Sequence, residues 1–138
     1  MVLNDIQQQF RRTVCEQIDL YPEGAGRARV FTPFRFDDGD HLVILLKQLP
    51  DGWAFTDEGH TLMRLTYTID DADLQQGSRK ILIESTLSML GVKEEDGALV
   101  MCSTQDDLGG SLYSFIEAIL KISDVTYLTP ESGPVYGQ

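Results

Sequence analysis

The chain has 138 residues, of which 42% are hydrophobic, and it carries 22 acidic against 11 basic side chains for a net charge of −11. This length fits one domain with one hydrophobic core, and the apolar fraction excludes wholesale disorder. The longest uninterrupted apolar run, Leu42–Leu46, is far shorter than the ~20 residues that cross a bilayer. Because the N-terminus also lacks the pattern of a secretion signal, we expect a cytoplasmic protein that does not enter membranes.

At the N-terminus, apolar residues recur at the spacing of an amphipathic helix. Ile6, Phe10, Val14 and Ile18 follow one another at four-residue steps, with Leu3 and Cys15 alongside. We expect Asn4 to cap the start of this helix, and the proline and glycines that follow residue 21 to end it.

Three apolar runs come next and predict three strands, at Ala28–Thr32, Leu42–Gln48 and Gly52–Thr56. Pro50-Asp51-Gly52 is a tight-turn sequence, which indicates that the second and third strands form an antiparallel hairpin. The run Leu42–Leu46 shows no polar alternation, so we expect a central strand that is covered on both faces.

The second half of the chain mixes helix and strand signals. A short run over His60–Tyr67 favours one or two helical turns, and Ser78 precedes a longer helix that ends at Gly91. Ala98–Ser103 is typical of a fourth strand. Asp106 or Asp107 is expected to cap a last helix, whose apolar stripe comprises Leu108, Leu112, Phe115, Ile116, Ile119 and Leu120.

The order of these elements predicts an α+β fold, with a small, mostly antiparallel sheet of about four strands packed with N-terminal, middle and C-terminal helices. We expect a single domain over residues 1–128 and a mobile tail over residues 129–138, which hold two prolines, two glycines and little apolar material.

The acidic excess lies after residue 36. Residues 1–36 balance to +1, so the remaining residues hold −12. Because nucleic acids are bound through Lys and Arg, this charge disfavours general nucleic-acid binding and favours a basic protein partner. The alternative is that the charge serves solubility alone. The predicted acidic interaction surface consists of Asp37, Asp38, Asp40, Asp70, Asp71, Asp73, Glu94, Glu95 and Asp96.

Candidate chemistry is concentrated in one segment, Thr56-Asp57-Glu58-Gly59-His60-Thr61, directly after an apolar strand. Carboxylates and imidazole hold divalent cations or act as acid and base, so one hypothesis is a small enzyme or a metal- or ligand-binding domain centred on Asp57, Glu58 and His60. The structural interpretation is that Thr56 or Asp57 caps the next helix and that Gly59 permits an unusual backbone angle. No phosphate-binding glycine loop or nucleophile elbow occurs, so we predict no cofactor and no catalytic residue.

Several short motifs carry a family resemblance. Phe31-Thr32-Pro33-Phe34, the turn Asp38-Gly39-Asp40 and the motif Thr56-Asp57-x-Gly59-x-Thr61 resemble the bacterial and phage family of domains of unknown function numbered 1828. The resemblance implies a small standalone domain of bacterial genomes and prophages with no established activity, and it transfers no catalytic residue. From the acidic balance after residue 36 and the missing catalytic motifs, we expect a non-enzymatic interaction module, such as an inhibitor or regulator in a prophage or defence context. The sequence does not specify its protein partner or its oligomeric state.

Overall fold

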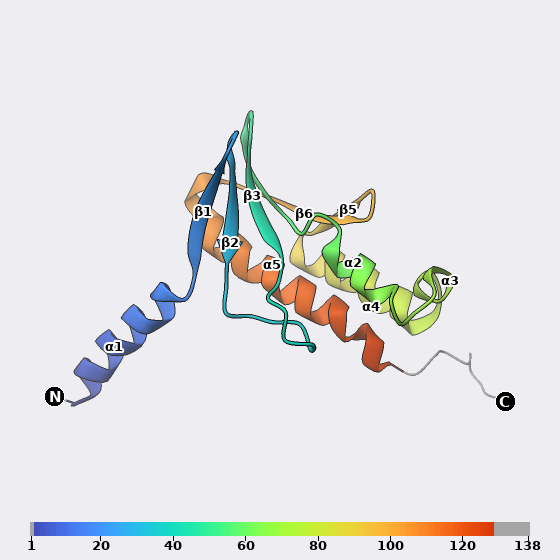
Figure 1. Cartoon of the computed structure of the whole chain (residues 1–138), viewed down its shortest axis with the longest axis horizontal. Coiled ribbons are helices and arrows are strands. Elements are labelled where there is room, and N and C mark those ends of the chain that lie inside the picture. Colours follow the sequence, from blue (N-terminus) through green and yellow to red (C-terminus); the bar gives the residue numbers. More distant parts are fainter. Residues whose placement is uncertain (1, 129–138) are drawn as a thin grey trace.

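The computed structural model describes residues 2–128, which form an α+β fold around one antiparallel sheet (Figure 1). Within these residues the sheet has six strands in the order β1-β2-β3-β4-β6-β5. The strands are β1 (Asp19–Gly24), β2 (Arg27–Phe31), β3 (Ile44–Leu49), β4 (Gly52–Thr56), β5 (Lys93–Glu95) and β6 (Ala98–Ser103). The helices are α1 (Val2–Glu16), α2 (His60–Leu65), α3 (Asp71–Leu74), α4 (Gly77–Leu90) and α5 (Leu108–Ser123), with short 3-10 turns at Gln105–Asp107 and Asp124–Tyr127.

The central strand is β3, as the apolar run predicts. Ile44 and Leu45 point to opposite faces of the sheet, and both are 0% exposed. On one face Ile44 joins the main hydrophobic core. On the other face Leu45 lies in register between Arg29 of β2 and Thr56 of β4. The hairpin predicted at Pro50-Asp51-Gly52 joins β3 to β4.

Helix α5 supplies much of the core from one side of the sheet, with α4 beside it (Figure 1). Its predicted apolar stripe is confirmed, because Leu112, Phe115, Ile116 and Ile119 are buried. The ring of Phe115 stacks on that of Phe55 in β4, with centroids 6.1 Å apart. This pair joins the helix layer to the middle of the sheet.

The sheet has two strands that the sequence patterns did not predict. In β1, Pro22 was interpreted as a helix breaker, yet the strand pairs with β2 across a turn in which Gly24, Ala25 and Gly26 all have positive φ. Pro22 is tolerated there because an edge strand does not need every backbone N–H. The second is β5, which pairs its acidic residues with β6 through Asp96 and Gly97, also at positive φ.

Several helix starts also differ from the prediction. Helix α1 begins at Val2, so Asn4 lies inside it, and α4 begins at Gly77, so Ser78 lies in its first turn. Asp107 precedes α5 as predicted but accepts no capping hydrogen bond. Its carboxylate instead lies over Gly110, where a Cβ would be 2.5 Å from Oδ1, which explains a glycine in this turn. At the other end of α4, Gly91 adopts the predicted left-handed cap.

The predicted tail, residues 129–138, lies outside the described residues. Within residues 2–128, no helix is long and apolar enough to cross a membrane.

The long β2–β3 connection is tied to the helix layer by Arg64 of α2. Its guanidinium pairs with Asp38 and, at 3.3 Å, with Asp40, and it lies 4.0 Å from the centre of the Phe36 ring. The backbone N–H of Asp40 donates to Asp38 at 3.0 Å, and this bond together with Arg64 holds the pKa of Asp38 below its ordinary value. Tyr127 donates its hydroxyl to Asp37 at 2.9 Å, which fixes the same loop from a second side.

This ion cluster leads to a prediction about pH. Because the folded-state pKa of Asp38 is lowered from 3.8, its stabilisation is complete above that value and is lost as pH falls through the lower folded-state pKa. We expect Arg64→Met to lower the Tm by a few degrees at pH 7, and the difference from wild type to shrink below pH 3.8, as measured by thermal unfolding.

The matched control is Lys121→Met, which breaks the exposed pair of Lys121 with Glu117 on α5. We expect almost no change in Tm, because exposed i,i+4 pairs contribute only about 0.3–0.5 kcal/mol. A deficit of Arg64→Met that is equally large at pH 7 and at pH 3 would contradict the assigned role of Asp38.

Candidate functional site

The Thr56–Thr61 segment is built around a buried carboxylate, that of Asp57, directly after β4. Asp57 is 1% exposed. Its Oδ1 accepts hydrogen bonds from the backbone N–H groups of Gly59 and Leu99, and its Oδ2 accepts one from Thr61, each at 2.9 Å. Leu99 belongs to β6, so the carboxylate joins the start of α2 to a neighbouring strand.

The backbone of this segment turns through two left-handed residues. Glu58 has a φ of 54° and Gly59 a φ of 86°, which confirms the predicted unusual angle at the glycine. The hydroxyl of Thr56 accepts the N–H of Glu58 at 3.1 Å, which stabilises the turn on its other side. Of the two predicted caps, only Asp57 accepts an N–H of α2, that of Thr61, whereas Thr56 serves the turn that precedes the helix.

The three ionisable side chains of the segment do not converge. The carboxylate of Asp57 points inward to backbone donors, whereas Glu58 reaches outward to Arg27 of β2, with Nη2 and Oε2 2.9 Å apart. This pair lowers the pKa of Glu58. The Nδ1 of His60 lies 3.0 Å from the carbonyl oxygen of Asp57. Within residues 2–128, no group of three His, Cys, Asp or Glu side chains is arranged to hold a metal ion.

One side of α2 borders a small hollow of about 210 Å³. Thr61, the last residue of the motif, is buried there, and neither its hydroxyl nor that of Ser123 has a hydrogen-bond partner among the described residues. Asp37 and Asp38 line the same hollow, together with Arg64. The first predicted acidic cluster, Asp37, Asp38 and Asp40, therefore pairs with Arg64 and Tyr127 of the same chain.

The other side of α2 borders a larger groove of about 440 Å³, which we name the acidic groove. Its apolar wall comes from α2, α3 and α4 and comprises Leu62, Met63, Leu74, Ile83 and Leu87. Five carboxylates surround this wall, those of Glu58, Asp71, Glu84, Glu94 and Asp96. The ammonium group of Lys80 lies among them. The groove therefore combines an apolar surface with an excess of negative charge.

The structure brings together only part of the predicted acidic surface. Asp71, Glu94 and Asp96 line the acidic groove, whereas Asp37 and Asp38 lie on the opposite side of α2. Asp40 pairs with Arg64 on that side as well. The remaining predicted members, Asp70, Asp73 and Glu95, do not line the groove.

Sequence reasoning missed the acidic groove itself. Glu58 was assigned to a different candidate site and Glu84 was not singled out, because their approach to Glu94 depends on how three separate elements pack. One signal was available. Helix α4 carries apolar residues on more than one side, with Ile83 buried and Ile81 and Met89 exposed, which indicates a helix that serves more than one surface.

The geometry of Asp57 leads to a stability prediction. We expect Asp57→Ala to lower the free energy of unfolding by about 3 kcal/mol, because each buried N–H left without a partner costs about 1–3 kcal/mol and such losses do not add fully. Asp57→Asn keeps Oδ1, which serves two of the three donors, so it should lie between wild type and Asp57→Ala in urea unfolding.

Glu58→Gln provides the control, because it changes the neighbouring acid, whose pair with Arg27 is about one-third exposed. Its expected cost is at most about 1 kcal/mol. If Asp57→Ala unfolds at the same urea concentration as wild type, the carboxylate does not hold the turn as described.

Comparison with known protein families places the Thr56–Thr61 segment inside a matched region of the chain. A family model described as a domain of unknown function, DUF1828, matches residues 32–122, a span that includes β3 to β6 and nearly all of α5. Neither the search of curated proteins nor that of solved structures found a match. The family match covers more than half of the chain and agrees with the resemblance of the Thr56–Thr61 motif, so the chain belongs to the DUF1828 family.

Proposed function

We propose that this chain is a non-enzymatic protein-interaction module that binds a basic, partly apolar segment of another protein in the acidic groove. One observation carries the proposal: five carboxylates from separate elements surround a continuous apolar wall, with Lys80 as the only cationic side chain among the groove's described lining residues. An excess of one charge around an apolar surface attracts ligands of the opposite charge and gives them a place to bury apolar atoms.

The groove also fits the shape of such a ligand. A volume of about 440 Å³ accommodates a few side chains, and it lies open along α2 and α4. Lys and Arg are suited to this surface because their aliphatic stems pack on apolar walls while their charged ends stay near the rim. A segment that presents apolar residues on one face with Lys or Arg beside them would satisfy both features.

The geometry of the Thr56–Thr61 segment supports a binding role over catalysis. The oxygens of Asp57 already serve three backbone donors, and Glu58 is paired with Arg27. The acidic rim also repels phosphate groups, which supports the absence of general nucleic-acid binding. A module of this kind acts by occupying the basic surface of its partner, as an inhibitor or regulator in a prophage or defence context would.

The proposal is tested with a defined probe. A synthetic amphipathic helix of leucine and lysine is titrated into the 15N-labelled chain, and backbone amide shifts are followed by NMR. We expect saturable shifts at groove residues such as Leu62 and Leu87, and weaker binding at higher salt because the charges are screened. The matched peptide of leucine and glutamate should cause no saturable shift.

Matched variants separate groove binding from general attraction to an acidic protein. Glu94→Gln with Asp96→Asn removes two groove charges, and Asp51→Asn with Asp106→Asn removes two exposed charges outside the groove. Each pair neutralises two acids and changes the net charge from −11 to −9. We expect the first pair to weaken binding on the order of tenfold, about 1.4 kcal/mol, and the second to have little effect. Equal weakening by both pairs would mean that the groove has no special role.

A further inference from the structure

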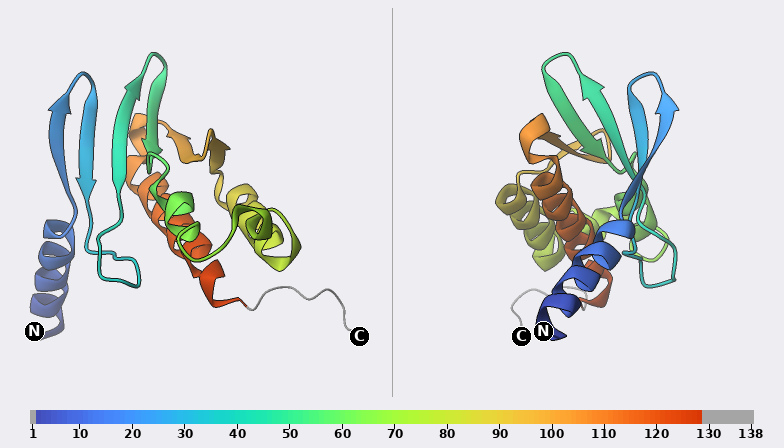
Figure 2. Two further views of the ribbon diagram at one scale, coloured as in Figure 1. Left: turned by 45° about the vertical axis from the view of Figure 1, so that its right-hand side comes forward. Right: turned by 90° about the vertical axis from the view of Figure 1, so that its left-hand side faces the viewer.

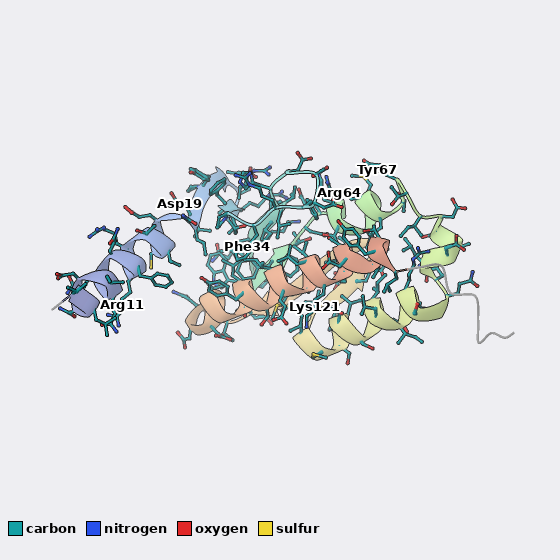
Figure 3. The ribbon with its side chains drawn as sticks, turned by 90° about the horizontal axis from the view of Figure 1, so that it is seen from below. Arg11, Asp19, Phe34, Arg64, Tyr67 and Lys121 are labelled. Carbon is teal, nitrogen blue, oxygen red and sulfur yellow. The ribbon has the colours of Figure 1, made fainter. Side chains whose placement is uncertain are left out.

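The N-terminal helix α1 stands apart from the rest of the molecule. The helix precedes β1 in the chain and extends away from the sheet and from α5 (Figure 2). No residue of α1 is buried against the described part of the chain. In the view from below, Arg11 on α1 lies far from Arg64 and Tyr67 on the body (Figure 3). The helix is thus an exposed element with little support from its own domain.

One face of α1 is apolar and open to solvent. Val2 is 69% exposed, Ile6 51%, Phe10 68% and Val14 38%. These residues lie on one side of the helix at the spacing expected for a buried face, and the polar side carries Asp5, Arg11, Arg12 and Glu16. A helix of this length is marginal in water without packing of its apolar face. A binding surface for this face is therefore required.

From these observations we infer that α1 is a dimerisation helix, whose apolar face packs against the same face of α1 in a second copy of this chain. Such a contact is isologous, because one patch serves both partners. This interaction is separate from the acidic groove and goes beyond the proposed function.

The distribution of charge favours a second copy at this position. The chain carries −11, so two copies repel each other through most of their surfaces. The first 36 residues, however, balance to +1, and the two acids of α1 are matched by Arg11 and Arg12. A contact through α1 brings together the parts of two copies that repel each other least. Because the charges on the polar face of α1 sum to zero, the helix has no net electrostatic attraction to an anionic membrane.

The available surface agrees with a modest dimer. Leu20 and Tyr21, near the start of β1, are also about half exposed. Consecutive strand residues point to opposite faces of a sheet, so only one of these two can extend the apolar face of α1. At roughly 100 Å² for each half-exposed large side chain, that residue and the four helix residues offer on the order of 500 Å² per copy. This is less than the ~800 Å² that one partner contributes to a standard interface, so we expect a weak dimer.

The edge of the sheet is less suited to the same purpose. Strand β1 pairs with β2 and forms one edge of the sheet among the described residues, but it contains Pro22, which has no N–H, and an irregular register between Pro22 and Gly24. Both features hinder the addition of a further strand. The helix face is therefore the surface that we assign to the second copy.

Analytical ultracentrifugation of the full chain over a range of concentrations tests this inference. We expect the mass to rise with concentration from 15.5 kDa towards twice that value, and association to strengthen with salt because the mutual repulsion is screened. Binding of the lysine peptide to the acidic groove has the opposite salt dependence, so the two proposals fail independently.

Two matched variants locate the contact. Ile6→Ala with Phe10→Ala changes the apolar face, and Asn4→Ala with Gln8→Ala changes the polar face at the same four-residue spacing and leaves the charge unchanged. Alanine preserves helix propensity in both. We expect the first variant to associate at least tenfold more weakly and the second to behave as wild type. A wild-type chain that stays monomeric throughout, or a dimer that neither variant weakens, would overturn the inference.

Cross-linking provides an independent readout. In a background with Cys15→Ser and Cys102→Ser, both native thiols being exposed, Phe10→Cys places a thiol on the apolar face and Gln8→Cys places one on the polar face. Mild oxidation should give a covalent dimer with the first and little with the second. Equal yields from both would contradict the assigned face, and so would a monomeric chain that binds anionic vesicles through Ile6 and Phe10.

Discussion

The carboxylate of Asp57 holds together the parts of the structure on which the proposed binding surface depends. Through Leu99 it fixes β6, next to the β5–β6 turn that supplies Asp96 to the acidic groove, and through Gly59 and Thr61 it fixes the start of α2. One side chain therefore positions α2 and the β5–β6 turn, two of the segments that line the groove, and α3 and α4 line the rest. A buried carboxylate is costly unless hydrogen bonds replace its hydration, and three backbone donors provide that replacement.

The sequence allowed prediction of the elements whose signals are local. The run around Leu45 identified the central strand, Pro50-Asp51-Gly52 the hairpin, and the stripe around Phe115 the main core helix. Strands β1 and β5 were not predicted, because their residues become strands through pairing with β2 and β6 and carry Pro22 or adjacent acids. The groove lay beyond prediction for a similar reason, since its lining comes from elements that are adjacent only after folding.

The charge of −11 has different meanings in different parts of the molecule. Around Arg64 the acids are internal partners that attach a loop to the helix layer. Around Leu62 and Leu87 five acids surround an apolar surface, and two of them, Glu58 and Glu84, pair with Arg27 and Lys80. The near-neutral N-terminal segment, residues 1–36, contributes Phe36 to the first arrangement and Arg27 to the second. Net charge alone describes none of these roles, because each depends on which cations lie nearby.

The family match begins at Thr32, one residue after β2 ends. The hairpin of β1 and β2 nevertheless covers the backbone edge of β3 and contributes Val30 to the core. Without it, Ile44–Leu49 would present free hydrogen-bonding groups beside apolar side chains on both faces, a template for amyloid-like stacking. At the other end, fully buried Val125 lies beyond the match. The span of the family match is thus narrower than the folded unit of this chain, because the match leaves out a strand that covers the edge of β3 and a residue of the buried core.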